Sequence, residues 1–336
     1  MSRVLCFGEL LMRLSPQLGG EWIRQATMPV FIGGAELNTA TALANWDVPA
    51  SYCTALPDHY LTKEIVESVE TKGIDISRIH YSGNRIGTYY LPQGADLKNA
   101  GVIYDRAYSS FWELKPGQLD WDAILDGVSW FNFSAISPAL NENVAAVCKE
   151  GAAAASEKGI TVSVDLNYRA KLWQYGKQPH EIMPELIEYC DVIMGNIWAE
   201  EKMLGISVPQ DIADEKEAYL VQSQKTSEEI LKRFPKCRQV ANTFRFDKAE
   251  GLHYYATLYT GGQLYLSAQH QTKTVVDRVG SGDTFMAGLI YGNFHKNAPQ
   301  DIIDFAAAAA FNKLFIKGDA TTSTVEDIKK DSLNYA

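Results

Sequence analysis

Near the carboxyl end the chain reads Val275-Val-Asp277-Arg-Val-Gly280-Ser-Gly282-Asp283-Thr-Phe-Met-Ala-Gly288, a strand-like start followed by a glycine-rich turn and a helix. Backbone N–H groups at the start of a helix point outward and the helix dipole adds partial positive charge, so this turn favours an anion. Glycines at 280 and 282 allow a phosphate to approach the backbone closely. A strand, an anion-binding turn and a helix in this order are typical of an α/β protein.

Two better-known phosphate motifs do not fit this turn. A dinucleotide fingerprint needs glycine where the sequence has Phe285, and a P-loop needs a Gly-Lys-Ser/Thr sequence that the turn lacks. The unusual feature is a carboxylate, Asp283, in the first turn of the helix. It has two interpretations: a helix N-terminal charge contributing ~0.3–1 kcal/mol, or a general base for a hydroxyl that attacks a phosphoryl group. In the second case the adjacent N–H groups would stabilise charge on the transferred phosphate.

Strand-like and helix-like segments alternate along the rest of the chain. A second glycine turn, Gly33-Gly-Ala-Glu-Leu-Asn38, also opens a helix. The predicted strands are 4–7, 10–14, 50–55, 128–133, 160–166, 192–194 and 239–243, then a meander of 252–259, 263–267 and 273–276. The predicted helices are 35–46, 60–72, 141–158, 180–189, 197–204, 283–293 and 300–316. This alternation predicts an α/β fold with a doubly wound, mostly parallel sheet and helices on both faces.

Two segments depart from this alternation. Residues 22–32 read as short strands interrupted by Pro29, and residues 84–112 read as a tyrosine-rich β-ribbon. We expect the segments at about 15–32 and 84–112 to pair as a small accessory sheet over one edge of the core. The polar, acidic stretch 210–229 is expected to be a mobile surface excursion.

Composition and charge limit the possible partners. The 336 residues are 46% hydrophobic, and 31 Lys and Arg against 41 Asp and Glu give a net charge of −10. Such a balance argues against nucleic acid or an anionic membrane as the main partner, and no apolar run approaches the ~18 residues of a spanning helix. Five widely spaced cysteines without a CxxC pair predict reduced thiols and a cytoplasmic location. The six histidines show no metal-ligand spacing, so we expect no metal site built from protein ligands.

The DxxGxGD pattern formed by Asp277, Gly280, Gly282 and Asp283 resembles the carboxyl-terminal signature of the ribokinase-like (PfkB) sugar kinases. The Gly33–Asn38 turn resembles the other signature of this family, in the expected order. The resemblance covers essentially the whole chain. It implies a single ribokinase-like domain, residues 1–336, in which segments 15–32 and 84–112 form a β-sheet lid.

The resemblance also implies roles for both turns. Asp283 would be the catalytic base, with an anion hole formed by Gly280, Ser281 and Gly282. The sugar would be contacted by Gly33, Gly34 and Asn38. ATP would lie over the carboxyl-terminal elements, with Mg²⁺ held mainly through phosphates and water. The family often carries an NxxE motif, but here the acids after Asn196 are Glu200 and Glu201, so either one substitutes for the family acid or its function is lost.

Two arginines indicate which class of sugar the protein binds. Arg169 follows a central strand, where ligands of doubly wound sheets bind, and Arg106 lies in the lid segment. A lone arginine is most often a surface ion pair worth under ~1 kcal/mol, whereas two that converge fit a carboxylated substrate. These residues resemble the 2-keto-3-deoxygluconate kinase branch, which implies that Tyr89, Tyr104, Arg106 and Arg169 contact a sugar acid. The implied reaction transfers phosphate from ATP to the 6-hydroxyl of 2-dehydro-3-deoxy-D-gluconate, giving the 6-phosphate and ADP.

Some assignments stay open. Asn196, Thr243 and Arg245 are expected on the nucleotide side, and Asn312 is either an adenine contact or a helix-surface residue. Glu9 either holds sugar hydroxyls or is a turn carboxylate. The alternatives are a kinase of a neutral sugar such as fructose or ribose, a nucleoside kinase, and a non-catalytic sugar or nucleotide sensor. Strand edges in the lid predict a homo-oligomer.

Overall fold

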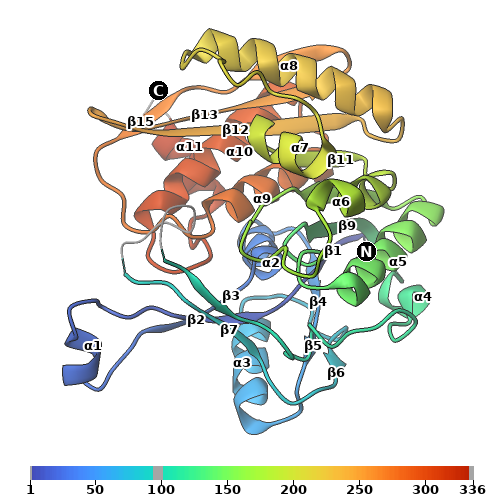
Figure 1. Cartoon of the computed structure of the whole chain (residues 1–336), viewed down its shortest axis with the longest axis vertical. Coiled ribbons are helices and arrows are strands. Elements are labelled where there is room, and N and C mark those ends of the chain that lie inside the picture. The colour runs from blue at the N-terminus through green and yellow to red at the C-terminus, as the bar shows by residue number, and fades with distance from the viewer. Residues whose placement is uncertain (1, 94–100, 333–336) are drawn as a thin grey trace.

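The computed structural model describes residues 2–93 and 101–332, and a nine-stranded sheet forms its centre (Figure 1). Its strand order is β14-β13-β12-β11-β10-β9-β1-β4, with β15 pairing β13. The strands are β1 (Arg3–Phe7), β4 (Ala50–Cys53), β9 (Val128–Ser134), β10 (Thr161–Asp165), β11 (Val192–Gly195), β12 (Gln239–Lys248), β13 (Gly251–Thr260), β14 (Gln263–Leu266) and β15 (His270–Thr272). Pairing is parallel from β4 to β12 and antiparallel beyond β12.

The central strands are buried on both faces, as a covered parallel sheet requires. In β1, Val4 and Cys6 pack into one apolar core while Leu5 and Phe7 pack into the other. The first core includes α2 (Ala35–Asn45), α3 (Tyr60–Glu70), α9 (Ser281–Phe294), α10 (Pro299–Asn312) and α11 (Val325–Ser332). The second includes α4 (Trp121–Ile124), α5 (Glu142–Glu157), α6 (Pro179–Ile187), α7 (Ile197–Leu204) and the end of α8 (Lys216–Arg233). The predicted doubly wound, mostly parallel sheet is confirmed.

A separate four-stranded sheet lies against the main body (Figure 1). Its order is β3-β2-β7-β8, formed by β2 (Leu11–Leu14), β3 (Val30–Gly33), β7 (Gly87–Tyr90) and β8 (Ile103–Asp105). The expected small sheet is therefore present, although its first strand begins before residue 15. Residues 94–100 of the expected segment 84–112 lie outside the described residues. A further pair joins β5 (Ala55–Leu56) to β6 (His80–Tyr81).

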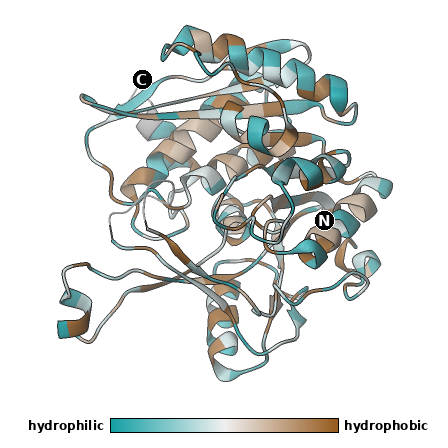
Figure 2. Cartoon of the chain, viewed as in Figure 1, coloured by the Kyte–Doolittle hydropathy of each residue, from teal (hydrophilic) through white to brown (hydrophobic). Residues whose placement is uncertain are grey.

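The prediction of short strands over 22–32 was wrong for its first part. Residues Glu21–Arg24 form the short helix α1 on an arm that projects between β2 and β3 (Figure 1). Gly19 and Gly20 have φ values of 81° and 79°, a left-handed turn that ends any extended run and opens the helix. Figure 2 shows hydrophobic colour on part of α1, where Ile23 is exposed.

The prediction of a mobile excursion over 210–229 was also wrong, because most of that stretch belongs to the 18-residue helix α8. Its inward face buries polar side chains beside apolar ones, including Gln222, Ser223 and Thr226. The hydroxyl groups of Ser223 and Thr257 lie 2.8 Å apart in a hydrogen bond. A face of this composition gives no apolar periodicity, which is why the helix was missed.

The segment before the anion-binding turn also differs from its prediction. Residues 273–276 form no strand, and the nearby strand is β15 at His270–Thr272. The backbone N–H groups of Val276 and Asp277 instead donate to the carbonyl of Leu314, at 2.8 and 3.2 Å. Leu314 belongs to a 3-10 turn, η1 (Lys313–Phe315), that replaces the predicted end of the last long helix. Across residues 2–93 and 101–332, no helix is long and apolar enough to cross a membrane.

Candidate active site

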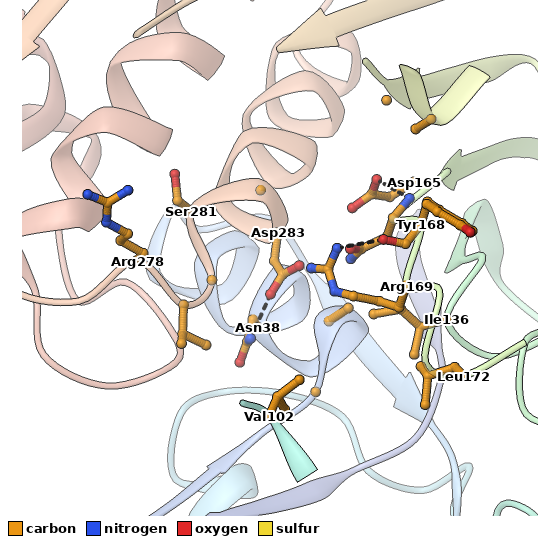
Figure 3. A pocket seen from close by; sticks show the side chains of 18 of the residues that line it. Asn38, Val102, Ile136, Asp165, Tyr168, Arg169, Leu172, Arg278, Ser281 and Asp283 are labelled. Atoms are coloured by element: carbon orange, nitrogen blue, oxygen red, sulfur yellow. Dashed lines mark hydrogen bonds between the residues drawn. The ribbon is translucent and has the colours of Figure 1, made fainter. Parts of the chain in front are cut away.

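A pocket of about 630 Å³ opens where the parallel strands of the main sheet end. Asp165 and Gly195 reach it from the ends of β10 and β11, and Gly34 and Gly280 reach it from the starts of α2 and α9. The carboxyl ends of parallel strands and the amino ends of helices meet at the same edge of such a sheet, which is where ligands bind. Figure 3 shows these segments converging around Asp283.

Asp283 lies buried at the start of α9 and faces this pocket. One carboxylate oxygen accepts a 2.7 Å hydrogen bond from the side-chain amide of Asn38, on α2 (Figure 3). Burial raises the pKa of Asp283 to about 7, assisted by the nearby carboxylates of Asp165 and Glu36 and opposed by Asn38 and Arg169. A carboxylate whose pKa lies near neutrality can accept a proton close to physiological pH.

The glycine turn before Asp283 uses its glycines for two different reasons. Gly280 has φ 79°, and a side chain there would meet the carbonyl oxygen of Asp319 at 1.7 Å, so the fold itself requires glycine. Gly282 has no such constraint, because a Cβ atom would find only Met194, at 3.9 Å. Its bare backbone faces the pocket, which leaves room for a ligand to approach the N–H groups. The Ser281 hydroxyl donates to the carbonyl of Ala310 at 2.8 Å, which ties the turn to α10.

The glycines of the amino-terminal turn pack closely against other parts of the chain. Gly34 lines the pocket with φ 137°, and a Cβ atom would lie 2.3 Å from the carbonyl oxygen of Glu9. Gly33 is not among the residues that line the pocket, and a Cβ atom there would meet the side chain of Asp319 at 2.4 Å. The structure therefore brings Gly34 and Asn38 to the pocket, whereas Gly33 is explained by packing.

Arg169 enters the pocket from the loop after β10 and points toward Asp283 (Figure 3). One of its terminal nitrogens, Nη1, donates to the carbonyl of Tyr168 at 3.0 Å. The positive charge of Arg169 opposes the rise in the pKa of Asp283, so the two groups interact electrostatically. The structure therefore joins a guanidinium and a buried carboxylate across one cavity.

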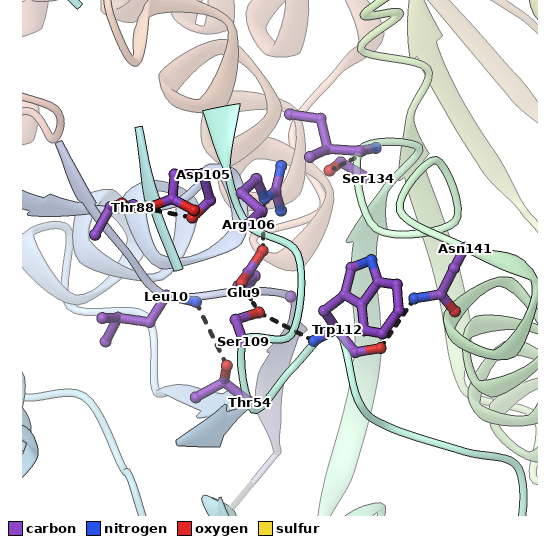
Figure 4. A network of polar contacts seen from close by, with 12 residues as sticks. Glu9, Leu10, Thr54, Thr88, Asp105, Arg106, Ser109, Trp112, Ser134 and Asn141 are labelled. Atoms are coloured by element: carbon purple, nitrogen blue, oxygen red, sulfur yellow. Dashed lines mark hydrogen bonds and ion pairs between the residues drawn. The ribbon is translucent and has the colours of Figure 1, made fainter. Parts of the chain in front are cut away.

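Arg106 also lines the pocket, but a protein carboxylate already holds it. Its Nε donates to Glu9 at 2.6 Å, and both side chains are buried (Figure 4). The other oxygen of Glu9 accepts a hydrogen bond from the Ser109 hydroxyl. Of the two readings of Glu9, the structure shows a carboxylate that holds Arg106 and also lines the pocket.

The two predicted tyrosines stand side by side on the small sheet, with ring centroids 6.3 Å apart, and both line the pocket. Tyr89 is almost fully buried, and its hydroxyl donates to Asp319 at 3.1 Å. Burial and the nearby Asp319 raise the pKa of Tyr89 well above its usual value. Tyr89 therefore contributes its ring rather than its hydroxyl to the pocket.

The predicted nucleotide-side residues separate into two groups. Asn196, Thr243 and Arg245 line the pocket, where Asn196 also caps α7 by accepting from the backbone of Ala199 at 2.9 Å. The hydroxyl of Thr243 donates to Gly195 at 3.3 Å. Asn312 is not among the lining residues, and its side chain accepts a 2.6 Å hydrogen bond from Ser323.

Neither glutamate after Asn196 lines the pocket. Glu200 points into the interior, where it is fully buried and its carboxylate oxygens have no hydrogen-bond partner among the described residues. Burial raises the pKa of Glu200 to about 8, partly offset by the nearby amide of Asn242. Glu201 accepts from the backbone of Val208 at 3.3 Å.

Several polar or aromatic residues that line the pocket were not predicted from the sequence. They are Glu36, Asp165, Lys171, Trp198, Lys202 and Arg278. Asp165 ends a parallel strand, and Glu36 lies within the Gly33–Asn38 turn, so their positions were available as a signal. The positions of Trp198 and Lys202 gave no such signal, because the orientation of α7 in the fold decides that they face the pocket.

The fold and this pocket define a small-molecule phosphotransferase: an anion-binding helix start, a buried carboxylate beside it and a cavity large enough for two substrates. The sequence matches the model of the pfkB family carbohydrate kinases over residues 1–324, and the chain belongs to that family. The predicted family resemblance is thus confirmed.

Three known proteins illustrate the similarity. The 2-dehydro-3-deoxygalactonokinase of Haloferax volcanii is 26% identical over 329 residues, covering 98% of this chain and 96% of the relative. The crystal structure of the 2-dehydro-3-deoxygluconokinase of Thermotoga maritima is 36% identical, with a TM-score of 0.88 over 99% of this chain and 100% of that one. A putative ribokinase II of E. coli in complex with ATP and Mg²⁺ is 15% identical, with a TM-score of 0.79 and full coverage of both chains, and shares the fold.

Proposed function

We propose that this kinase transfers the terminal phosphoryl group of ATP to the 6-hydroxyl of 2-dehydro-3-deoxy-D-gluconate, giving the 6-phosphate and ADP. The observation that carries the proposal is the shared pocket of Arg169 and Asp283. The guanidinium of Arg169 suits the carboxylate of a sugar acid, and the carboxylate of Asp283 suits its reacting hydroxyl. The similarity to kinases of 2-dehydro-3-deoxy sugar acids supports the same substrate class.

Asp283 acts as the general base in this proposal. Its carboxylate accepts the proton of the 6-hydroxyl, the oxygen forms a bond to the terminal phosphorus, and the bond from that phosphorus to ADP breaks. The hydrogen bond from Asn38 fixes the carboxylate so that its other oxygen is available to the substrate. The backbone of Gly280, Ser281 and Gly282 forms the anion hole that stabilises charge on the transferred group.

The residues present fit ATP on the carboxyl-terminal side of the pocket. The bare backbone of Gly282 provides a cradle that a Cβ atom would fill, at the amino end of a 14-residue helix. Asn196, Thr243 and Arg245 line the same pocket. When bound, Mg²⁺ neutralises phosphate charge, and it is held mainly through the phosphates and water.

The small sheet is the lid in this proposal. Leu11, Tyr89 and Tyr104 bring it to the pocket wall, so that segments 15–32 and 84–112 would close over the sugar within one domain spanning residues 1–336. Closure would exclude water and limit wasteful hydrolysis of ATP. Together with Gly34 and Asn38, which also line the pocket, the lid would enclose the sugar.

One observation favours a second candidate, a neutral-sugar kinase. The sequence predicts two arginines that converge on a carboxylate, but Arg106 is paired with Glu9 through its Nε. With a neutral sugar such as fructose or ribose, the arginines would be free of ligand or paired with protein carboxylates, and Arg106 is paired in this way. The terminal nitrogens of Arg106 have no hydrogen bond to another described residue, so a carboxylate can still be shared between Arg106 and Arg169.

The deciding experiment is an ADP-release assay with ATP and Mg²⁺ on five acceptors tested in parallel. These are 2-dehydro-3-deoxygluconate, 2-dehydro-3-deoxygalactonate, fructose, ribose and adenosine. Turnover confined to the sugar acids supports the proposal, and a preference between the two shows which configuration at C4 the pocket accepts. Turnover on fructose or ribose favours the second candidate. Turnover on adenosine favours a nucleoside kinase. If no acceptor is turned over but a ligand binds tightly, the result favours the non-catalytic sensor.

The state of the protein in the cell forms a separate part of the proposal. Exposed apolar side chains gather on the small sheet and its arm, namely Leu18, Ile23, Val30 and Ile103. A second copy covering this face would give a homo-oligomer, which light scattering would detect. The five cysteines are free and buried, as expected of a protein kept in the reducing cytoplasm.

A further inference from the structure

Lys313 is completely buried beside the anion-binding turn, yet it does not line the pocket. It begins the 3-10 turn after α10, and its Cε lies 3.5 Å from the point where a Cβ atom on Gly280 would stand. A buried ammonium is costly to keep unless something in the fold benefits from its charge. Nothing in the proposed reaction so far uses this group.

The ammonium is only lightly held. Its Nζ donates to the carbonyl of Ile316 at 3.0 Å, the one hydrogen bond of this side chain to any described residue. No described carboxylate lies within ion-pair distance of Nζ. An ammonium has three donors, so its charge is not cancelled by direct contact.

The neighbouring carboxylates are already occupied by another cation. Arg13, on β2, donates to Asp319 at 2.7 Å and to Asp277 at 2.9 Å, and it stacks over the ring of Phe31. Asp277 in turn accepts from the backbone N–H groups of Val279 and Gly318, at 3.0 and 3.2 Å. The cluster of Arg13, Asp277 and Asp319 therefore braces the turn, and Lys313, whose Cε lies close to Gly280, keeps a charge that no described carboxylate contacts directly.

We propose that Lys313 is a positioning residue of the kinase, an internal cation that keeps the Gly280–Asp283 turn in its anion-binding shape and makes it more positive. This inference rests on the proposed phosphoryl transfer. The ammonium does not touch the substrates; it acts through the backbone of the turn. Its effect is largest when negative charge is greatest at the turn, so turnover depends on it more strongly than the KM for ATP does.

The charge of Lys313 itself depends on pH. Burial lowers the pKa of Lys313 to about 8. The carboxylates of Asp277 and Asp319 counteract this decrease, the positive charge of Arg13 adds to it, and the carboxylate of Asp283 also counteracts it. These are the charged groups that face the ammonium from β2, the turn, α9 and the loop after η1. Below about pH 8 the ammonium is charged, and above it the charge and the activity that depends on it are lost.

The test compares Lys313→Met and Lys313→Ala with Lys317→Met, a control at an exposed lysine four residues away. We expect Lys313→Met to lower kcat ~10- to 100-fold with a smaller change in the KM for ATP, and Lys317→Met to leave both unchanged. Ammonium or methylammonium chloride should partly restore kcat in Lys313→Ala, whereas tetramethylammonium chloride at equal ionic strength should not. The wild type should lose activity above about pH 8, and Lys313→Met should not show that loss.

Each outcome decides the proposal. A kcat of Lys313→Met equal to that of the wild type overturns it, as does an unaltered alkaline profile. If both variants fail to fold, the wild-type profile decides, and constant activity to pH 10 overturns the proposal. If the wild type acts on none of the five acceptors, the proposed function fails separately. Calorimetry of MgATP binding then decides the role of Lys313, and equal affinity in the wild type and Lys313→Met overturns it.

Discussion

The side-chain amide of Asn38 donates a 2.7 Å hydrogen bond to the carboxylate of Asp283, a residue 245 positions further along the chain. Each residue stands in the first turn of a helix that a glycine opens, Gly34 for α2 and Gly280 for α9. The hydroxyl of Thr39 reinforces the junction by donating to the backbone carbonyl of Asp283 at 3.2 Å. The two helix starts thus hold one carboxylate at the pocket wall.

Replacing the carboxylate by an amide tests the general base. We expect Asp283→Asn to lower kcat by ~10²–10⁴ while MgATP binding stays close to that of the wild type, because the amide cannot accept the proton. Steady-state kinetics and calorimetry measure the two effects. Asp301→Asn, the same change at an exposed residue in the first turn of α10, is the control. Wild-type turnover in Asp283→Asn would rule out the role of base.

The same carboxylate predicts a pH dependence. Burial raises the pKa of Asp283 to about 7, and a base works only when ionised, so protonation below about pH 7 removes activity. We expect kcat/KM to fall roughly tenfold per pH unit below this value. The measurement is kcat/KM for the sugar acid from pH 5 to 8 at constant ionic strength. A flat profile down to pH 5 would contradict the assignment.

The two glycines of the turn should respond differently to alanine. At Gly282 a methyl group meets only Met194, at 3.9 Å, so Gly282→Ala should keep the melting temperature of the wild type. The methyl group occupies space that the phosphoryl group needs, so activity should fall by at least ~10-fold. Gly280→Ala should instead unfold at lower temperature, since φ is 79° and the carbonyl oxygen of Asp319 stands 1.7 Å from the new atom. Full activity in Gly282→Ala would show that the ligand does not approach the turn there.

Arg169 should distinguish a sugar acid from a neutral sugar. Loss of a charge-assisted hydrogen bond costs ~1.5–3 kcal/mol, so Arg169→Ala should raise the KM for the sugar acid ~10- to 150-fold. The KM for ATP should change little. Arg233→Ala, on the exposed side of α8, serves as the control. An unchanged KM for the sugar acid would remove Arg169 from the carboxylate site.

Glu200 predicts an effect on stability. Its folded-state pKa is raised to about 8 from 4.5 by burial, so the folded protein binds one more proton than the unfolded chain between these pH values. The free energy of unfolding therefore falls as pH rises through this window, by at most ~1.4 kcal/mol per pH unit from this group. Glu200→Gln should reduce that slope, and Glu201→Gln should not. Urea unfolding at pH 5, 6.5 and 8 gives the slopes, and identical slopes in wild type and Glu200→Gln would contradict the prediction.

Much of the fold was readable from local sequence because the parallel strands are short apolar runs between long helices. The helix Ile197–Leu204 has the predicted bounds, and Ala35–Asn45 differs from its prediction by one residue. The helix α8 was not readable, because its buried face includes serine, threonine and glutamine. The arm at α1 depends on Gly19 and Gly20, two glycines with left-handed backbone, whereas the sequence predicted short strands interrupted by Pro29.

Site residues that belong to a sequence motif or follow a strand could be predicted from the sequence. Residues whose role depends on which distant side chain they pair with could not. Asp283, Asn38 and Arg169 come from motifs or strand ends, and all three line one pocket. The pairing of Arg106 with Glu9 joins residues 97 positions apart, and no local pattern reports which acid an arginine selects. Lys313 follows an alanine-rich helix and gave no signal, because its importance comes from the segments that surround it.

The ion pairs of Arg13 also have a consequence for the order of folding. Arg13 lies 306 positions before Asp319 and 264 before Asp277, and both pairs are largely buried. A ribosome releases Arg13 long before either partner exists, so the growing chain carries an uncompensated cation in a strand that cannot yet be buried at low cost. The small sheet therefore cannot dock in its final position until the last stretch of chain has been synthesised. Contacts of such long range also slow folding, so the anion-binding turn should be among the last parts of the molecule to form during refolding.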